Sequence, residues 1–235
     1  MSNGTGNFAF YEDYEKTVFA LQPELYREIG SIIDSEIRRF VERTGSPPRI
    51  MDVGSAGVTP FDTALARSTT ILDLFEKPPN LALKSNVVWR VGDILDTQAV
   101  KACEFDIVII SSVLHHLADR RNNVVANIEL AFRNISSYLK RGGVLLIFES
   151  VCPNALATAQ DLLYPVYSRI LVRLFKFTYV RMLSLGEIVR ALNSAGLSQE
   201  EVPFRQPSHI AQMRWRVPSK YYPLKVCCLK ATTRS

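Results

Sequence analysis

The sequence predicts a single α/β domain built on a mostly parallel, Rossmann-like β-sheet with helices on both faces. Its 235 residues suit one domain with additions. Hydrophobic residues make up 47% and charged residues 22%, which is ordinary usage for a globular protein. Short β-rich runs alternate with helix-length segments along the first 150 residues, the pattern of a parallel sheet covered by helices.

Composition also narrows the class of protein. No apolar run approaches the roughly 18 residues that cross a membrane, and the N-terminus lacks the basic start and apolar stretch of a secretion signal. The four cysteines, at positions 103, 152, 227 and 228, have no paired metal-ligand spacing. We therefore expect a cytoplasmic protein with reduced thiols and no metal site. The net charge of +5 is compatible with anionic partners but does not require them.

Residues 1–45 are predicted to form an N-terminal helical cap, which begins with a loose tail at residues 2–7. Pro23 suits a first helical turn, and Gly45-Ser46-Pro47-Pro48 ends the helix. The apolar residues between them recur at helical spacing and form one stripe: Leu25, Ile29, Ile32, Ile33, Ile37, Phe40 and Val41.

Residues 49–150 are predicted to form the core of the sheet. A short helix is expected over Thr59–Ala66, because Pro60 suits the first turn and Thr59-x-x-Asp62 resembles a capping box. A longer one is expected over Asn122–Leu139, closed by Arg141-Gly142-Gly143. Five runs are apolar enough to be strands buried on both faces: Arg49–Val53, Thr69–Phe75, Val87–Val91, Phe105–Ile110 and Val144–Phe148.

The pattern changes after Ser150. Residues 151–183 contain no obvious strand, and we interpret them as a helical lid inserted over one end of the sheet rather than as a second domain. Ser184-x-x-Glu187 opens an amphipathic helix that ends at Gly196, and Val226–Ala231 is the expected last strand. Residues 184–235 therefore complete one domain that spans residues 1–235.

Candidate site residues follow the strands in order. In an open parallel sheet, ligands bind outside the carboxyl ends of the strands. The first strand ends in Asp52-Val53-Gly54-Ser55-Ala56-Gly57, a turn that lets a ligand approach the backbone. The dinucleotide fingerprint requires glycine where Ala56 stands and glycine or alanine at Thr59, so a pyrophosphate cradle fits poorly. A purely structural tight turn is the alternative.

Two acids follow the next strands. Asp73, 21 residues after Asp52, can accept both hydroxyls of a ribose. Asp93 can accept the exocyclic amine of an adenine while Ile94 packs on the ring. Alone, Asp73 can equally cap a helix or lie in a solvated loop, and Gly92-Asp93 is a common turn.

Ionisable groups also end the fourth and fifth strands. His115 and His116 stand together after the fourth strand, where chemistry would occur, although a histidine is often a structural residue. Glu149 follows the fifth strand and points to the same crevice, or else caps a turn or pairs with an arginine.

Taken together, the sites from about Arg49 to Ala231 resemble those of class I S-adenosylmethionine-dependent methyltransferases, in their small-molecule branch. Val113-Leu114-His115-His116-Leu117-Ala118-Asp119 is similar to the motif after their fourth strand, and Leu139-Lys140-Arg141-Gly142-Gly143-Val144-Leu145-Leu146-Ile147 to the turn into the fifth. The resemblance implies a seven-stranded sheet whose last strand is antiparallel. The cofactor-binding set that it implies is Asp52, Gly54, Ser55, Ala56, Asp73, Leu74, Asp93, Ile94 and Ser111.

One departure bears on cofactor affinity. The family usually has D/E-x-G-x-G-x-G, and here Ala56 and Val58 replace the second and third glycines. A methyl group at position 56 could crowd the methionine part of the cofactor, although Gly57 can relieve the turn.

The resemblance also implies a reaction. By analogy with O-methyltransferases, His115 takes the proton of a hydroxyl acceptor and Glu149 holds the imidazole, with His116 as the reserve candidate. Two alternatives stay open. One is N- or C-methylation of a small molecule, including a lipid-like quinone at a membrane surface. The other is a catalytically weak module that binds the cofactor and serves as a partner of another protein.

The lid is expected to select an apolar or aromatic small molecule. Its candidate substrate-binding residues are Tyr164, Tyr167, Phe175, Tyr179 and, less directly, Phe177; packing within the protein is the alternative for such a stripe. Arg169, Arg173 and Lys176 raise a third possibility, peripheral contact of residues 162–183 with an anionic membrane. Nucleic acid is not expected as a substrate, because Ser111-Ser112-Val113-Leu114 replaces the N/D/S-P-P-Y/F/W run of enzymes that methylate its amino groups.

Overall fold

The structure, a computed structural model, describes residues 22–96, 98, 100–119, 121–175, 179–207, 209–212, 215–218 and 223–233. At residues 171, 174, 175, 209–212 and 215–218 the structure describes the backbone only. The expected N-terminal tail and the lid residues Lys176 and Phe177 lie outside the described residues.

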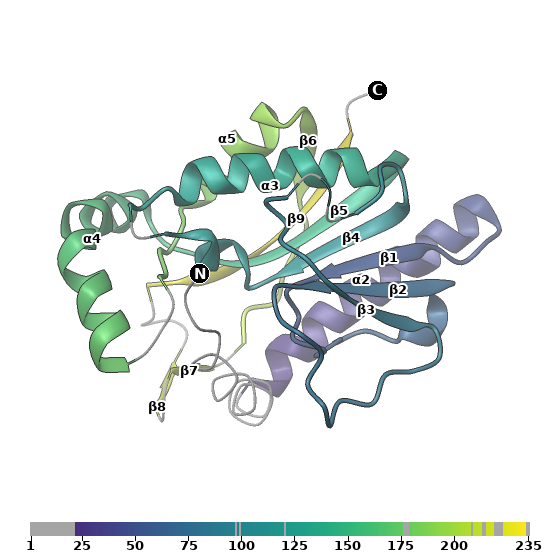
Figure 1. Cartoon of the computed structure of the whole chain (residues 1–235), viewed down its shortest axis with the longest axis horizontal. Helices are drawn as coiled ribbons and strands as arrows, with labels where there is room; N and C mark the ends of the chain where they lie inside the picture. Colours follow the sequence, from purple (N-terminus) through teal and green to yellow (C-terminus); the bar gives the residue numbers. More distant parts are fainter. Residues whose placement is uncertain are drawn as a thin grey trace.

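A seven-stranded sheet forms the centre of the molecule, in the order β3-β2-β1-β4-β5-β9-β6 (Figure 1). Strands β1 to β5 are parallel, and β9 runs antiparallel to both of its neighbours, as predicted. Strand β6 is the seventh strand, whose position was not assigned from the sequence, and a separate two-stranded sheet of β7 and β8 was not expected. The strands are β1 Arg49–Val53, β2 Ser68–Asp73, β3 Val87–Val91, β4 Phe105–Ser111, β5 Leu139–Val151, β6 Leu197–Glu201, β7 His209–Gln212, β8 Trp215–Pro218 and β9 Lys225–Thr233.

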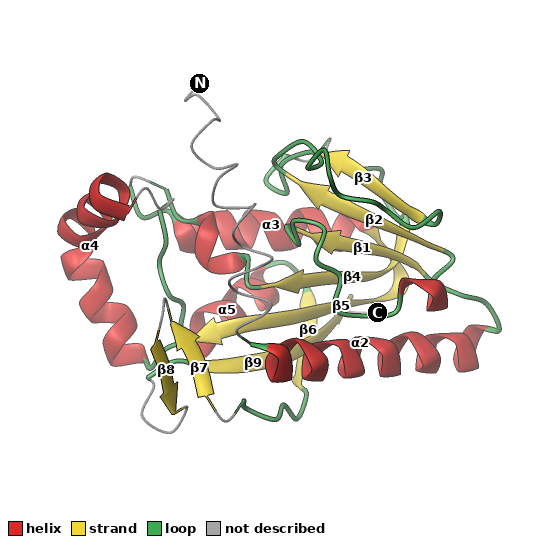
Figure 2. Ribbon diagram, turned by 90° about the horizontal axis from the view of Figure 1, so that it is seen from below, coloured by secondary structure: helices red, strands yellow, loops and turns green. Residues whose placement is uncertain are grey.

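Helices cover both faces of the sheet (Figure 2). Helix α2 (Pro23–Thr44) packs on one face, and Gly45, in the left-handed conformation, ends it as the sequence predicts. Helices α3 (Val124–Tyr138) and α5 (Leu185–Ser194) pack on the other face. The capping box of Ser184 and Glu187 begins α5, also as predicted.

The predicted helix over Thr59–Ala66 is wrong. Only a 3-10 helix, η2 (Thr63–Leu65), forms there, and the Asp62 side chain caps it by accepting the Ala64 N–H at 3.0 Å. The physical reason is the position of α2, which already fills this face of the sheet. Phe61 is buried in the same apolar cluster as α2, so the segment packs beneath that helix as a loop.

The turn expected at Arg141-Gly142-Gly143 is instead part of a strand. Strand β5 begins at Leu139, directly after α3, and its pairing with β4 shifts register between Phe105 and Ile107. Gly142 takes a left-handed φ of 73° within this irregularity. A bulge thus absorbs the extra residues without a separate loop.

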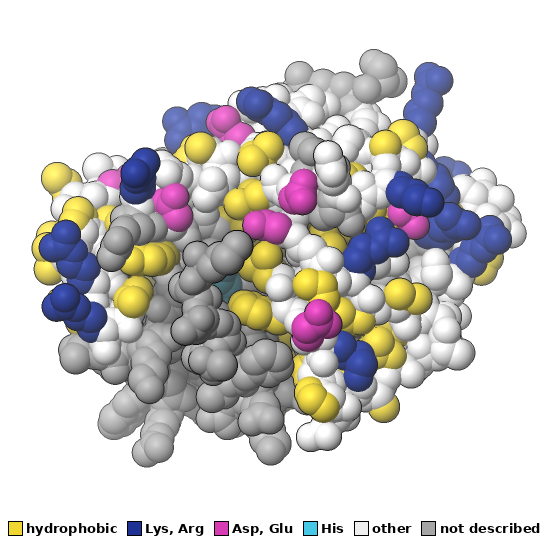
Figure 3. Space-filling model, in the orientation of Figure 1, with side chains coloured by type: hydrophobic (Ala, Val, Ile, Leu, Met, Phe, Trp, Pro, Cys, Tyr) yellow, Lys and Arg dark blue, Asp and Glu magenta, His cyan; other side chains and the backbone are white. Residues whose placement is uncertain are grey.

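The segment interpreted as a lid, residues 151–183, contains one long helix, α4 (Asn154–Phe175), with Pro165 inside it. This helix lies beyond the carboxyl ends of β4 and β5, away from the helices that cover the sheet (Figures 1 and 2). On its outer side, at the left edge of Figure 3, hydrophobic and basic side chains lie next to each other. Among the described residues, no helix is both long and apolar enough to cross a membrane.

Replacing Gly30 with Ala should destabilise the protein. Gly30 lies in the buried face of α2, where an added Cβ would come 2.1 Å from the backbone oxygen of Pro60. Because a backbone atom cannot rotate away, α2 would have to shift, at a cost of about 1–3 kcal/mol in unfolding free energy, measurable by urea denaturation.

Gly186→Ala is the matched control, because this second helical glycine has no atom closer than 4.0 Å to an added Cβ. It should leave stability unchanged or raise it by up to about 1 kcal/mol through helix propensity. Equal effects of the two substitutions would contradict close packing of α2 on the loop before η2.

Candidate functional site

The turn after β1 is the first part of the candidate site. Gly54, Ala56 and Gly57 all have positive φ, at 66°, 52° and 87°. The Gly54 N–H donates to the Leu72 carbonyl at 2.8 Å, which joins the turn to β2. An added Cβ at Gly54 would lie 2.8 Å from Cγ2 of Val113, so only glycine lets the segment after β4 come this close.

Ala56 keeps the glycine conformation without being glycine. A left-handed φ costs a residue with a Cβ roughly 1–2 kcal/mol. Its N–H donates to Oδ2 of Asp73 at 3.2 Å, which offsets part of this cost. The departure from the family pattern therefore changes the side chain at position 56 and preserves a turn with glycine-like backbone angles.

The carboxylate of Asp73 holds two segments together. Its Oδ1 accepts the Phe75 N–H at 3.2 Å, while Oδ2 accepts from Ala56. Burial raises the pKa of Asp73. The next side chain, Leu74, is exposed and offers an apolar surface beside this acid.

The turn after β3 adjoins Asp73. The Gly92 N–H donates to the Asp73 carbonyl at 2.8 Å, so the two segments lie side by side. Asp93 accepts the Leu95 N–H at 2.8 Å, and the buried Ile94 is held by Asn134 of α3, whose side chain donates to the Ile94 carbonyl at 2.8 Å.

Three buried polar atoms near these turns lack a hydrogen-bond partner within the described part of the chain. They are Oδ2 of Asp52, near the end of β1, Oγ of Ser55, in the turn after β1, and Oγ of Ser111, at the end of β4. Burial, with a smaller contribution from the nearby Asp73, raises the pKa of Asp52 to about 7, although the neighbouring Ser55 hydroxyl lowers it. Buried polar atoms are normally satisfied. A bound ligand with polar and cationic groups would meet this requirement.

A buried acid and a histidine form the closest polar pair of the site. Nδ1 of His115 lies 2.8 Å from Oε1 of Glu149, whose side chain is completely buried. The same carboxylate accepts the Leu114 N–H on Oε2 and the Ser150 N–H on Oε1, both at 2.8 Å. Strand β5 continues to Val151, so Glu149 lies within the strand rather than at its end.

This pair fixes which nitrogen of His115 can act as a base. A carboxylate only accepts hydrogen bonds, so Nδ1 of a neutral His115 carries the proton and donates it to Glu149. Nε2 is then the basic nitrogen. The ring of His116 lies 4.1 Å from that of His115, but the contact with Glu149 belongs to His115. Both histidines lie on η3 (Leu114–Leu117).

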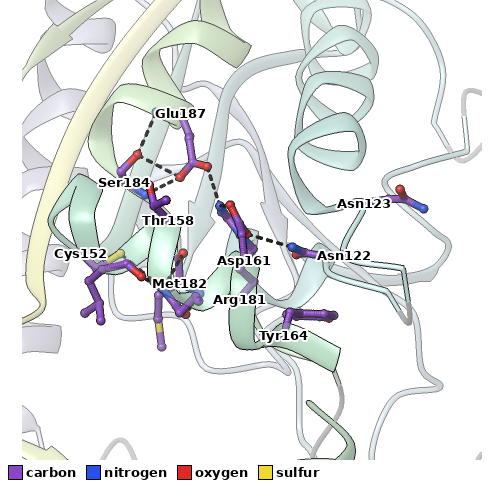
Figure 4. A network of polar contacts seen from close by, with 12 residues as sticks. Asn122, Asn123, Cys152, Thr158, Asp161, Tyr164, Arg181, Met182, Ser184 and Glu187 are labelled. Atoms are coloured by element: carbon purple, nitrogen blue, oxygen red, sulfur yellow. Dashed lines mark hydrogen bonds and ion pairs between the residues drawn. The ribbon is translucent and has the colours of Figure 1, made fainter. Parts of the chain in front are cut away.

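Arg181 was not singled out from the sequence, yet it connects three parts of the site (Figure 4). Its buried guanidinium donates to both carboxylate oxygens of Asp161 on α4, at 2.6 and 2.8 Å, and to Glu187 on α5 at 2.7 Å. Its backbone N–H donates to the His115 carbonyl at 3.1 Å. One sequence signal could have pointed to Arg181, because it is a single arginine among apolar residues directly before the capping box of α5.

The aromatic residues of the lid pack mainly within the protein. Tyr164 is buried and donates its hydroxyl to the Asp119 carbonyl at 2.7 Å; burial raises its pKa to about 12. Tyr167 donates to the Val180 carbonyl at 3.3 Å, and the two rings meet edge to face. Tyr179 lines a hollow beside Arg169 and Arg173, and the side chain of Phe175 lies outside the described residues.

Among the residues that the structure describes, no group of three or more His, Cys, Asp or Glu side chains could hold a metal ion.

Comparison with known proteins supports the same family. Residues 51–147 match the family described as "Methyltransferase domain". No curated protein matches the sequence.

The YcgJ protein of Bacillus subtilis has a similar structure, with 15% identity, a TM-score of 0.57, and 85% of this chain and 98% of that chain covered. The CurJ carbon methyltransferase follows with 13% identity, a TM-score of 0.53, and 87% and 54% covered. The N-methyltransferase NodS of Bradyrhizobium japonicum, solved with S-adenosyl-L-homocysteine, has 15% identity, a TM-score of 0.52, and 87% of each chain covered. At these identities the likeness shows the fold.

Replacing Asp52 with Asn should flatten the pH dependence of stability. With a pKa raised from 3.8 to about 7, Asp52 keeps its proton in the folded state where the unfolded chain has lost it. Wild-type stability therefore falls as the pH rises through this window, by up to about 4 kcal/mol. Urea unfolding of the cofactor-free protein at the two ends of the window measures this loss.

Asp62→Asn, at an exposed loop aspartate, is the control and should retain the wild-type pH dependence. The burial argument fails if Asp52→Asn loses as much stability as the wild type when the pH is raised.

Proposed function

We propose that this class I S-adenosylmethionine-dependent methyltransferase, identified by its methyltransferase domain and its sheet, methylates a hydroxyl group of a small, largely apolar acceptor. The observation that carries the proposal is the 2.8 Å contact between His115 and the buried Glu149. A histidine whose Nδ1 is held by a buried carboxylate keeps Nε2 available as a base, which is what a hydroxyl acceptor requires.

Several contacts support the assignment of the cofactor-binding residues. Asp73 is proposed to accept the ribose hydroxyls with its remaining lone pairs, and Asp93 the adenine amine, with Ile94 and Leu74 as apolar neighbours. The positive φ values of Gly54 and Ala56 open the backbone to close approach, with Ser55 between them. The unpartnered oxygens of Asp52 and Ser111 fit a ligand that is cationic and rich in polar groups.

When bound, the cofactor would supply a methyl group on a cationic sulfur, open to in-line attack on the methyl carbon by an acceptor lone pair. The new bond would join the acceptor oxygen to that carbon, and the electron pair of the broken carbon–sulfur bond would stay on the sulfur that leaves. In this proposal Nε2 of His115 takes the hydroxyl proton. Glu149 stabilises the imidazolium that results, and its burial strengthens that interaction because water is excluded.

The acceptor atom distinguishes this proposal from its alternatives. A neutral amine or an already activated carbon needs little help from a base, so His115 would then contribute mainly to structure. A catalytically weak module that only binds the cofactor would need no general base, and it would not need to bind the cofactor tightly enough for turnover.

Asp73→Ala should abolish measurable binding of S-adenosylmethionine or S-adenosylhomocysteine in calorimetric titration. The substitution removes the acceptor for the ribose and releases the Ala56 N–H that shapes the turn. Asp34→Ala, on α2 across the sheet, also removes an acceptor of a backbone N–H and should bind like the wild type. A folded wild-type protein with no affinity for either ligand would favour the partner-module alternative.

His115→Ala should lower kcat by about 10²–10⁴-fold with little change in cofactor affinity, because a general base contributes that much. The assay is transfer of labelled methyl groups to a panel of small phenols, followed by kinetics on the best acceptor. Glu149→Gln should cost less, since it retains an acceptor for His115.

His116→Ala is the control for His115→Ala, since its neighbour carries the contact with Glu149. Loss of turnover in His116→Ala alone would move the base assignment to that residue. Near-full turnover in both variants would refute general-base catalysis and advance N- or C-methylation.

A further inference from the structure

Helix α4 exposes an apolar face to solvent. Leu162, Leu163, Val166 and Ile170 are 79%, 60%, 61% and 46% exposed. At 100° per residue these positions fall on one side of the helix. Tyr164 and Ser168, on the opposite side, are buried against the rest of the protein. Helix α4 thus packs on the protein through one side and presents apolar side chains to solvent on the other.

This concentration of exposed side chains is unusual for the molecule. Of the ten large hydrophobic residues that are exposed in the described part of the chain, five lie on α4, and the fifth is Leu156. The others are spread over β2–β3 and α3. Single exposed apolar residues need no explanation, whereas a contiguous patch marks an interaction surface.

Positive charge accompanies the apolar face. Arg169 and Arg173 are exposed, and at 100° per residue they fall on the same side of α4, toward its C-terminal end. Figure 3 shows basic and hydrophobic side chains next to each other at the left of the molecule. No acidic residue occurs between Leu162 and Arg173. The single acid of the helix, Asp161, is neutralised by Arg181. The surface therefore has an apolar centre and a cationic border with no competing negative charge.

We propose that this face of α4 docks on the surface of an anionic lipid bilayer. Apolar side chains of an interfacial helix enter the boundary between headgroups and acyl chains, while arginines reach the anionic headgroups. A protein partner would have to match the arginines with acids at fixed positions, whereas lipid headgroups rearrange around them. The proposal concerns attachment to the surface and does not depend on which atom the enzyme methylates.

The test is flotation of the full chain with vesicles of phosphatidylcholine, alone or containing phosphatidylglycerol. We expect binding to the anionic vesicles that weakens as salt is added. Val166→Glu should reduce the partition coefficient at least about tenfold, because it places a charge in the apolar face. Arg173→Gln should reduce it about fivefold on anionic vesicles and leave weak binding to neutral ones unchanged.

Matched controls lie elsewhere on the surface. Val88, 56% exposed on the edge strand β3, is as accessible as Val166, and Arg133 is an exposed arginine on α3. Val88→Glu and Arg133→Gln make the same chemical changes and should bind vesicles like the wild type. Thermal unfolding verifies that every variant is folded.

Absence of wild-type binding to anionic vesicles would overturn the proposal. So would equal losses in Val166→Glu and Val88→Glu, which would show that charge, not the α4 face, governs binding. If the wild type were instead a dimer that Val166→Glu dissociates, without vesicle binding, the face would belong to a contact between two copies of the chain.

Discussion

The buried carboxylate of Glu149 is the constraint on which the rest of the site depends. A carboxylate without solvent is costly unless its oxygens are hydrogen-bonded. Here the backbone of Leu114 and Ser150 and the ring of His115 meet that demand. Because two of the three donors come from the segment after β4, that segment is held against β5, and rotation of the histidine would remove one of the three hydrogen bonds of a buried carboxylate.

A second buried group, Arg181, links the segment after β4 to helix α4. Nε and Nη2 of Arg181 pair with acids from α4 and α5, while its backbone N–H donates to the carbonyl of His115. Buried ion pairs add little net stability, because desolvation offsets the attraction, but breaking one is expensive. The value of this network therefore lies in specificity: it allows one position of the lid relative to the proposed base.

Much of the fold could be predicted from the sequence because its signals are local. Strands β1 to β5 are apolar runs, and α5 begins with its own capping box. The predictions failed where distant packing decided the outcome. The capping pattern at Thr59 does not begin a helix, because α2 already occupies that face of the sheet. Strand β6 is polar, so no apolar run in the sequence indicates it. Within the site, His115 and Glu149 were found through a family pattern, whereas Arg181 meets its partners only after folding. Sequence also could not tell that Tyr164 points inward.

The altered glycine motif illustrates why a pattern should be judged by the conformation it encodes. Glycine is required where φ is positive or where a side chain would collide. Gly54 meets both conditions, since a Cβ would strike Val113. At Ala56 the backbone takes the positive φ of 52° nonetheless, and the carboxylate of Asp73 accepts its N–H. The strain that glycine would avoid is thus partly offset by an acid that the ribose would also engage. Under the proposed assignment of Asp73 to the ribose, one side chain both shapes the turn and binds the cofactor, whereas glycine at position 56 would let the turn form with less help from Asp73.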